Sequence, residues 1–356
     1  MKKSSNLYPT IKNERISGWG RREFVNSKLI NFDSNQQIIN FVKRKNILSF
    51  ITRGLGRSYG DAAQLKEDFV TNVNFMNGIS IIGNEVTVGA GITIRQLLEV
   101  IIPLGYYLPV SPGSANVSIG GAIAADVHGK NHHRVGSLGN HISRILLIDG
   151  NGVIRELKPE SNQSNKNNIF FWATVGGMGL TGVILEATIS LIQIKTSKMK
   201  VDTFICNELD SLMDLMRVMD KKYSYSVAWV DSLDEKGRGV LTCGEHAEIN
   251  DLEKRSSNYL KYEINNSVGA PKFMPNGILN KITVKAFNEF WFRKSSLNRN
   301  NLQSIPQFFH PLDGINNWNR IYGSSGFYQY QFVIPDDKGS FILETLDRLK
   351  KISAYS

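Results

Sequence analysis

The chain has 356 residues, of which 41% are hydrophobic and 21% charged, and its formal net charge is +10. This length predicts two domains with separate cores, and no apolar run reaches the roughly 18 residues that a membrane span needs. The N-terminal sequence has lysines but no apolar stretch of the secretory type. We therefore expect a cytoplasmic protein, with association with the inner face of the membrane as an open alternative.

Residues 48–193 show the pattern of an α/β unit. Leu97, Leu98 and Ile101 lie at helical spacing behind Thr93, a suitable N-cap, and predict a helix between Gly91 and Gly105. The sequence Gly-Asn-Gly at 150–152 is typical of a hairpin turn. Short segments rich in β-branched residues predict strands at Ser49–Arg53, Glu85–Gly89, Arg144–Asp149, Val153–Leu157 and Gly182–Ile194.

The glycine-rich character fades after Lys195, which indicates a second domain. Leu209–Asp220 predicts an amphipathic helix with methionines in the core. Cys206 and Cys243 are too few for a disulfide framework and are predicted to be buried small apolar residues, and no Cys or His spacing indicates a metal site. Strands are predicted at Tyr225–Val230, Gly239–Thr242 and, from the alternation in FYQYQFVI, Phe327–Ile334.

Much of the positive charge lies in one segment, Lys254–Ile305, with nine Lys or Arg residues and two acidic ones. Such a segment suits an anionic lipid surface or a phosphorylated amphiphile as well as it suits nucleic acid. A solvated basic face over a core explains it equally well. Nucleic acid is disfavoured because it leaves the glycine-rich segments unexplained. The interleaved aromatic residues are Tyr259, Tyr262, Phe273, Phe287, Phe290, Trp291 and Phe292.

The most informative segment is Ser111–Gly136, SPGSANVSIGGAIAADVHGKNHHRVG. Its glycines let backbone N–H groups approach an anion, and its alanines leave room for a flat ligand. This order predicts a pyrophosphate-bearing cofactor beside a reaction centre. The polar cluster that follows consists of His128, Lys130, His132, His133 and Arg134.

Two further glycine-rich segments accompany it: Arg53–Ala63, RGLGRSYGDAA, and Phe171–Gly182, FWATVGGMGLTG. Neither is a P-loop, and the glycine spacing after Gly56 differs from the dinucleotide pattern G-x-G-x-x-G. Each segment alone is explained by turns. The occurrence of all three in one domain favours a cofactor site.

These motifs resemble the FAD-linked oxidases of the vanillyl-alcohol-oxidase type, which have a PCMH-type FAD-binding domain. The segments named above, with YSYSVAWVD, WNRIYG and YQYQFVIP, resemble the subfamily that oxidises a polyprenyl-phospho-ribose. The resemblance implies an α+β fold, with an FAD-binding domain of two α/β subdomains over residues 1–195. An antiparallel-sheet substrate domain over residues 196–356 would follow, incomplete at its C-terminal end because members of the subfamily continue further.

The resemblance also implies site residues. His128, Lys130 and Gln331 would be catalytic, and the substrate would meet Lys130, Trp229, Tyr322, Gln329 and Gln331. Many relatives attach the flavin covalently through a His in the pattern G-x-G-H-S; here Arg57 stands at that position, so non-covalent FAD is expected. The implied cofactor-binding residues are Arg53, Gly54, Leu55, Gly56, Arg57, Ser58, Tyr59, Gly60, Asp61, Pro112, Gly113, Ser114, Asn116, Gly120, Gly121, Ala124, His128, Gly129, Asn131, His132, Gly179, Gly182 and Val183.

The implied reaction is oxidation of the ribose 2′-hydroxyl to a 2′-keto sugar by hydride transfer to the flavin. It would be the first half of an epimerisation from ribose to arabinose in cell-wall arabinan biosynthesis, completed by a reductase partner of the short-chain-dehydrogenase type. Two alternatives stay open. One is an FAD-dependent oxidase of a soluble sugar alcohol or aldonolactone, and the other is an inactive FAD-binding fragment.

Overall fold

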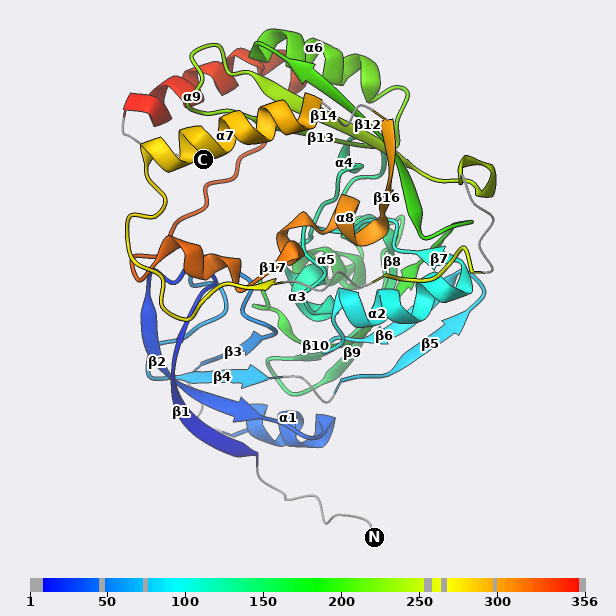
Figure 1. Cartoon of the computed structure of the whole chain (residues 1–356). Coiled ribbons are helices and arrows are strands. Elements are labelled where there is room, and N and C mark those ends of the chain that lie inside the picture. Colours follow the sequence, from blue (N-terminus) through cyan, green and yellow to red (C-terminus); the bar gives the residue numbers. More distant parts are fainter. Residues whose placement is uncertain are drawn as a thin grey trace. The chain divides into compact units, whose positions relative to one another are not determined.

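The computed structural model describes residues 9–44, 49–72, 76–252, 258–263, 268–296 and 300–351. Residue contacts divide the chain into two compact units, and each is described by itself (Figure 1). The first unit is Met1–Ile194 with Gly326–Tyr328, and the second is Lys195–Ser325 with Gln329–Ser356. Within the predicted basic segment, residues 253–257, 264–267 and 297–299 lie outside the described residues.

The first sheet of the first unit contains parallel and antiparallel pairs. Its strands, in spatial order, are β1 (Thr10–Ser17), β2 (Phe24–Asn31), β4 (Phe69–Asn72) and β3 (Phe50–Arg53). β1 pairs antiparallel with β2, whereas β4 pairs parallel with β2 and with β3. Helix α1 (Asn35–Val42) buries Phe41, whose ring meets the rings of Phe32, Phe50 and Phe69 edge-on with centroids 5.2–5.9 Å apart. This aromatic cluster fixes β3, the strand that leads into the first glycine-rich segment.

The second sheet of this unit is entirely antiparallel. Its strands, in spatial order, are β5 (Ile79–Ile82), β6 (Glu85–Gly89), β10 (Gly182–Ser190), β8 (Ile142–Asp149) and β9 (Ile154–Leu157). The hairpin of β8 and β9 has the turn at 150–152 that the sequence predicts. The strand expected at 182–194 ends at Ser190, and β11 (Ile192–Gln193) then pairs with β7 (Tyr106–Tyr107).

Helices α2 (Ile94–Ile101), α3 (Ile119–Ala124), α4 (His132–Val135) and α5 (Lys166–Thr174) complete the first unit. Thr93 caps α2 as predicted, because its side chain accepts a hydrogen bond from the amide of Gln96 at 3.1 Å. The Gln96 side chain accepts in return from the Thr93 amide at 3.0 Å, which completes a capping box. Leu97, Leu98 and Ile101 are fully buried, so the predicted helix and its apolar face are confirmed.

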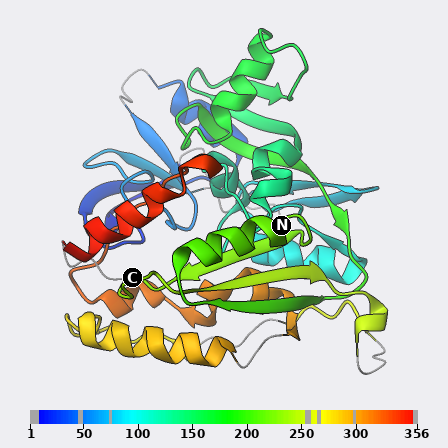
Figure 2. The ribbon, with the colours of Figure 1, turned by 90° about the horizontal axis from the view of Figure 1, so that it is seen from above.

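The second unit is built on an antiparallel sheet with the spatial order β13 (Tyr225–Val230), β14 (Gly239–His246), β12 (Lys198–Cys206) and β16 (Asn300–Ser304). Helices α6 (Leu209–Met219) and α9 (Ser340–Lys351) both contribute side chains to its core cluster. Figure 2 shows the ribbon of these elements from above. The predicted helix and the first two predicted strands are confirmed. Cys206 and Cys243 are free and buried in this cluster, as predicted. The remaining elements are β15 (Val268–Gly269), α7 (Lys281–Ser296), α8 (Ile305–Phe309) and β17 (Ile315–Asn316).

A buried polar network holds α7 against the turn between β13 and β14. The Asn288 amide nitrogen donates to Asp231 at 2.6 Å, and both side chains are nearly inaccessible to solvent. The Arg238 guanidinium donates twice to the same carboxylate, at 3.0 and 3.1 Å, and pairs with Glu289 on α7 at 2.8 Å. Asn288 and Glu289 thus face the β13–β14 turn, and three apolar side chains of α7 are left exposed: Ile282, Phe287 and Phe290 are 81%, 58% and 60% exposed.

The strand predicted at Phe327–Ile334 is wrong. Residues 327–334 form no strand, and Tyr330 and Val333 are each 84% exposed. The alternating pattern is the one expected for the side chains of a strand, but a strand also needs a neighbouring strand to pair its backbone hydrogen bonds. Instead the Phe327 amide donates to the Gly20 carbonyl at 2.8 Å, and the chain returns to the first unit for Gly326–Tyr328. These three residues were expected in the second domain.

Candidate active site

The first glycine-rich segment is shaped by the arginine at the end of β3. The Arg53 guanidinium donates to the carbonyls of Ala63 at 2.9 Å and Ser17 at 2.8 Å, and burial lowers its pKa. Gly56 has a φ of +63°, and a Cβ there would lie 2.2 Å from the guanidinium. Arg53 therefore holds the loop in shape through its side chain, and Gly56 is required by this close packing.

The loop offers backbone donors to an anion. Among the described residues, the amides of Leu55, Gly56, Ser58 and Gly60 donate no hydrogen bond. A Cβ placed on Gly60 would meet nothing within 4 Å, so this part of the loop faces open space. Several unpaired N–H groups on a glycine-rich loop form a concave site for phosphate oxygens.

Arg57 joins this loop to the second glycine-rich segment. Its guanidinium lies 3.8 Å above the centre of the Trp19 ring and donates to the Asn116 carbonyl at 3.0 Å. The Asn116 side chain accepts in turn from Arg95 at 3.1 Å. Gly54 packs against the N-terminus of α3 in the same region. A Cβ placed on Gly54 would lie 2.2 Å from the Ser118 hydroxyl. The first two predicted segments are thus adjacent.

The third segment packs against the second. The Gly176 amide donates to the Ile123 carbonyl at 3.0 Å, and the Met178 amide donates to the Ala124 carbonyl at 2.8 Å. A Cβ on Gly179 would meet nothing within 4 Å. All three predicted glycine-rich segments therefore meet within the first unit.

The polar cluster follows α3. His128 and His132 have ring centroids 5.7 Å apart. Lys130 is half-buried, and the loss of hydration lowers the pKa of its ammonium to about 8. Asn131 is 4% exposed; its amide nitrogen donates to the Pro109 carbonyl at 2.8 Å, while its buried Oδ1 accepts no hydrogen bond from the described residues.

These features fit a dinucleotide with a flat ring. The unpaired amides around Gly60 match the demand of a pyrophosphate, and the orphaned Oδ1 of Asn131 matches a ring N–H donor. Two predicted cofactor residues have a structural role besides. A Cβ on Gly182 would lie 2.2 Å from the Ile148 carbonyl, and the Val183 side chain is fully buried. Their contact with a cofactor stays a prediction.

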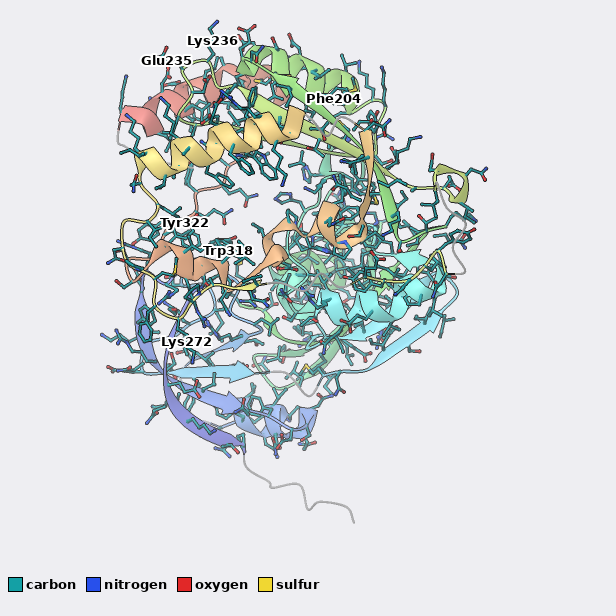
Figure 3. The ribbon with its side chains drawn as sticks, viewed as in Figure 1. Phe204, Glu235, Lys236, Lys272, Trp318 and Tyr322 are labelled. Carbon is teal, nitrogen blue, oxygen red and sulfur yellow. The ribbon has the colours of Figure 1, made fainter. Side chains whose placement is uncertain are left out.

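The predicted substrate residues other than Lys130 belong to the second unit. Trp229 lies on β13. Tyr322 is the last residue of a short helix, η5 (Trp318–Tyr322), and Figure 3 labels Trp318 and Tyr322 at its two ends. Burial raises the pKa of Tyr322. Gln329 and Gln331 lie in the exposed, non-helical segment after Tyr328. Their roles around one substrate stay predictions.

Sequence reasoning missed the turn at Trp19 and its partner at Phe327. The Gly20 amide donates to the Tyr59 carbonyl at 3.0 Å, and the Tyr59 ring meets the Phe327 ring edge-on with centroids 5.4 Å apart. A Cβ on Gly20 would lie 2.4 Å from the Phe327 carbonyl, so the turn admits only glycine there. The sequence Gly-Trp-Gly is a turn signal that could have drawn notice, whereas its distant partner has no local signal.

Unpaired loop amides, an orphaned buried amide oxygen and a mixed α+β domain define a cofactor-binding domain. Residues 28–158 match the FAD binding domain family, so the predicted PCMH-type fold and FAD cofactor are confirmed. The chain is 38% identical to decaprenylphosphoryl-beta-D-ribose oxidase of Mycolicibacterium smegmatis, over 94% of this chain and 74% of that protein. The chain belongs to this family of FAD-dependent oxidases.

Lactone oxidases match only part of the chain. D-arabinono-1,4-lactone oxidase of Eremothecium gossypii is 26% identical over 40% of this chain and 26% of its own length. L-gulonolactone oxidase 3 of Arabidopsis thaliana is 27% identical over 41% of this chain and 25% of its own length. The likeness to the Mycolicibacterium protein thus extends much further along the chain.

Proposed function

We propose that this protein oxidises the 2′-hydroxyl of a polyprenyl-phospho-ribose to the 2′-keto sugar. The observation that carries the proposal is the 38% identity to the Mycolicibacterium oxidase over 94% of the chain. It is supported by a first unit in which three glycine-rich segments meet beside His128 and Lys130. The soluble-lactone alternative rests on relatives that share less than half of the chain.

FAD, when bound, supplies the acceptor for the hydride that leaves the ribose C2. The chain's own residues bind the cofactor and manage the proton. Lys130 is proposed to contact the hydroxyl that is oxidised, because a pKa of about 8 leaves part of the amine neutral near neutral pH. That amine takes the hydroxyl proton as the C–H bond breaks. Gln331 is proposed to hydrogen-bond the sugar, and Trp229 and Tyr322 are proposed to contact the substrate as well.

We propose further that α7 lies on an anionic membrane surface, where a lipid-linked substrate is found. Its outward face combines exposed aromatic rings with lysines: Phe287 stacks on Trp291 with centroids 6.3 Å apart, and the Lys294 ammonium lies 5.8 Å from the Phe290 ring centre. Among the helices of the described residues, none combines the length and the apolar composition that a membrane span needs. A short-chain-dehydrogenase-type reductase would then act on the 2′-keto product.

The first test is anaerobic addition of a polyprenyl-phosphoribose to the purified yellow protein, followed at the flavin absorption band. Bleaching with this substrate, and none with ribitol or an aldonolactone, is the expected result. Bleaching by the soluble compounds alone would support the lactone or alditol oxidase instead. A flavin that none of these substrates reduces would support the inactive-fragment alternative.

A matched pair of variants tests the cofactor site. Gly60→Ala adds a methyl group to the open space beside the unpaired amides, whereas Gly150→Ala adds one at an equally open hairpin turn away from the site. Overpacking against bound FAD costs about 1–3 kcal/mol, so Gly60→Ala should weaken FAD affinity by about 5- to 150-fold. Equal FAD affinity in both variants would remove Gly60 from the cofactor site.

A further inference from the structure

The polar cluster sits on a loop whose two limbs run back toward each other. His128 and Ser137 form an antiparallel β-bridge, and the Leu138 amide donates to the Val127 carbonyl at 2.9 Å. The loop between these limbs carries Lys130. Its position therefore depends on whatever holds the base of the loop together.

The base is held by the carboxylate of Asp126. One oxygen accepts from the Ser137 hydroxyl at 2.7 Å, and the other accepts from the Gly139 amide at 2.9 Å. Among the described residues, no cation pairs with this carboxylate. Hydrogen bonds to an ionised acceptor are stronger than those between neutral groups. Both bonds of Asp126 thus tie the outgoing limb to the returning limb.

Asp126 also stands where the second and third glycine-rich segments meet. It has a φ of +41°, a left-handed conformation that Asp and Asn tolerate better than most residues. A Cβ on Gly139 would lie 3.0 Å from its Oδ1, and a Cβ on Gly176 would lie 3.4 Å from its Cβ. Helix α3 ends at Ala124, and Asp126 directly follows its C-cap, Ala125. The Asp126 side chain is therefore packed against Gly139 and Gly176 as well as hydrogen-bonded to the returning limb.

We infer that Asp126 is a positioning residue, whose carboxylate clamps the loop 126–139 and so holds His128 and Lys130 in place beside the cofactor segments. It acts through the loop and needs no contact with the substrate. The reaction that it serves rests on the proposed function, whereas the clamp itself can be measured without substrate.

Three variants separate the contributions. Asp126→Ala removes both hydrogen bonds and suits the left-handed conformation poorly. Asp126→Asn keeps that conformation and an acceptor for the Gly139 amide. Ser137→Ala removes one bond and leaves Asp126 intact. Amide hydrogen exchange at Leu138 and Gly139 measures the clamp, and the FAD dissociation constant and anaerobic flavin reduction measure its consequences.

In Asp126→Ala we expect exchange at the two amides to accelerate about tenfold or more, and FAD to bind more weakly. Flavin reduction at saturating substrate should slow by about 10–100-fold with little change in KM, because misplacing a reacting group lowers the rate of the chemical step. Asp126→Asn should recover most of each loss. Ser137→Ala removes only one of the two hydrogen bonds, so its exchange and flavin-reduction rates should lie between those of Asp126→Ala and the wild type.

Wild-type exchange rates in all three variants would overturn the clamp. Faster exchange with flavin reduction unchanged would overturn the positioning role. If Asp126→Ala does not fold, the same measurements on Ser137→Ala and Asp126→Asn decide between these outcomes. If the wild-type flavin is not reduced by a polyprenyl-phosphoribose, the proposed function fails. In that case amide hydrogen exchange at Leu138 and Gly139, together with the FAD dissociation constant, still decides whether Asp126 orders the loop.

Discussion

The packing of Gly54 against Ser118 gives the sharpest prediction for the cofactor-binding unit. In Gly54→Ala the new Cβ would lie 2.2 Å from the Ser118 hydroxyl oxygen, so that oxygen has to move. The same oxygen caps α3, since it accepts from the Gly121 amide at 3.2 Å. The substitution therefore disturbs two features at once, the approach of the first loop and the N-terminus of α3.

The expected cost follows from these contacts. Loss of the Ser118 cap costs about 1 kcal/mol, and overpacking costs a further 1–3 kcal/mol. Replacing glycine by alanine at a φ that alanine tolerates also stabilises the folded protein by about 0.4–1 kcal/mol, because it lowers the conformational entropy of the unfolded chain. Gly54→Ala should thus lower the free energy of unfolding by about 1–3 kcal/mol, or the Tm by about 3–10 °C for a unit of this size.

The assay is a double-mutant cycle on the free energy of unfolding, measured by denaturant titration of the protein without FAD. Ser118→Ala alone should cost about 1 kcal/mol, and it also removes the atom that clashes with Ala at position 54. The double variant should therefore be more stable than the sum of the single losses predicts, by about 1–2 kcal/mol. Simple additivity would refute the close contact between the loop and α3.

Three further predictions concern separate parts of the chain. His246 is kept neutral by burial, which lowers its pKa to about 4, so stability should fall by about 3 kcal/mol as pH drops from 6.5 to 4. This pH slope, measured by urea unfolding, should flatten in His246→Gln. Asn288→Ala removes a buried hydrogen-bond donor to Asp231 and should lower the free energy of unfolding by about 1–3 kcal/mol in the same assay. An unchanged urea midpoint would contradict the network. Acid precipitation should release all of the FAD, because Arg57 offers no imidazole for a covalent bond; flavin retained in the pellet would contradict this.

The cofactor segments could be predicted because their signals are local. A glycine-rich loop after a strand, a run of small residues and a capping threonine each depend on neighbours within a few positions, as Thr93 and Gln96 illustrate. The convergence of three such segments was inferred from their number alone, and the contacts from Gly54 to Ser118 and from Gly176 to Ile123 are its physical form.

The remaining features depend on distant partners. Alternation in residues 327–334 describes the side chains of a strand but carries no information about a neighbouring backbone, so the predicted strand was wrong. The pairing of Phe327 with Gly20 and Tyr59 likewise joins positions 307 and 268 residues apart, and no short-range pattern marks it.

Asp126 shows the same limit within a well-recognised motif. Sequence reasoning directs attention to the residues that could touch a cofactor or a substrate, such as His128 and Lys130. An acid just before them has no obvious chemical task, and its role becomes visible only when Ser137 and Gly139 return to it. The reacting groups of such a loop must be fixed in position as well as present, because a small displacement of a reacting group lowers the reaction rate by a large factor. The side chains that do this holding are therefore the ones that a motif search overlooks and that contacts between distant limbs reveal.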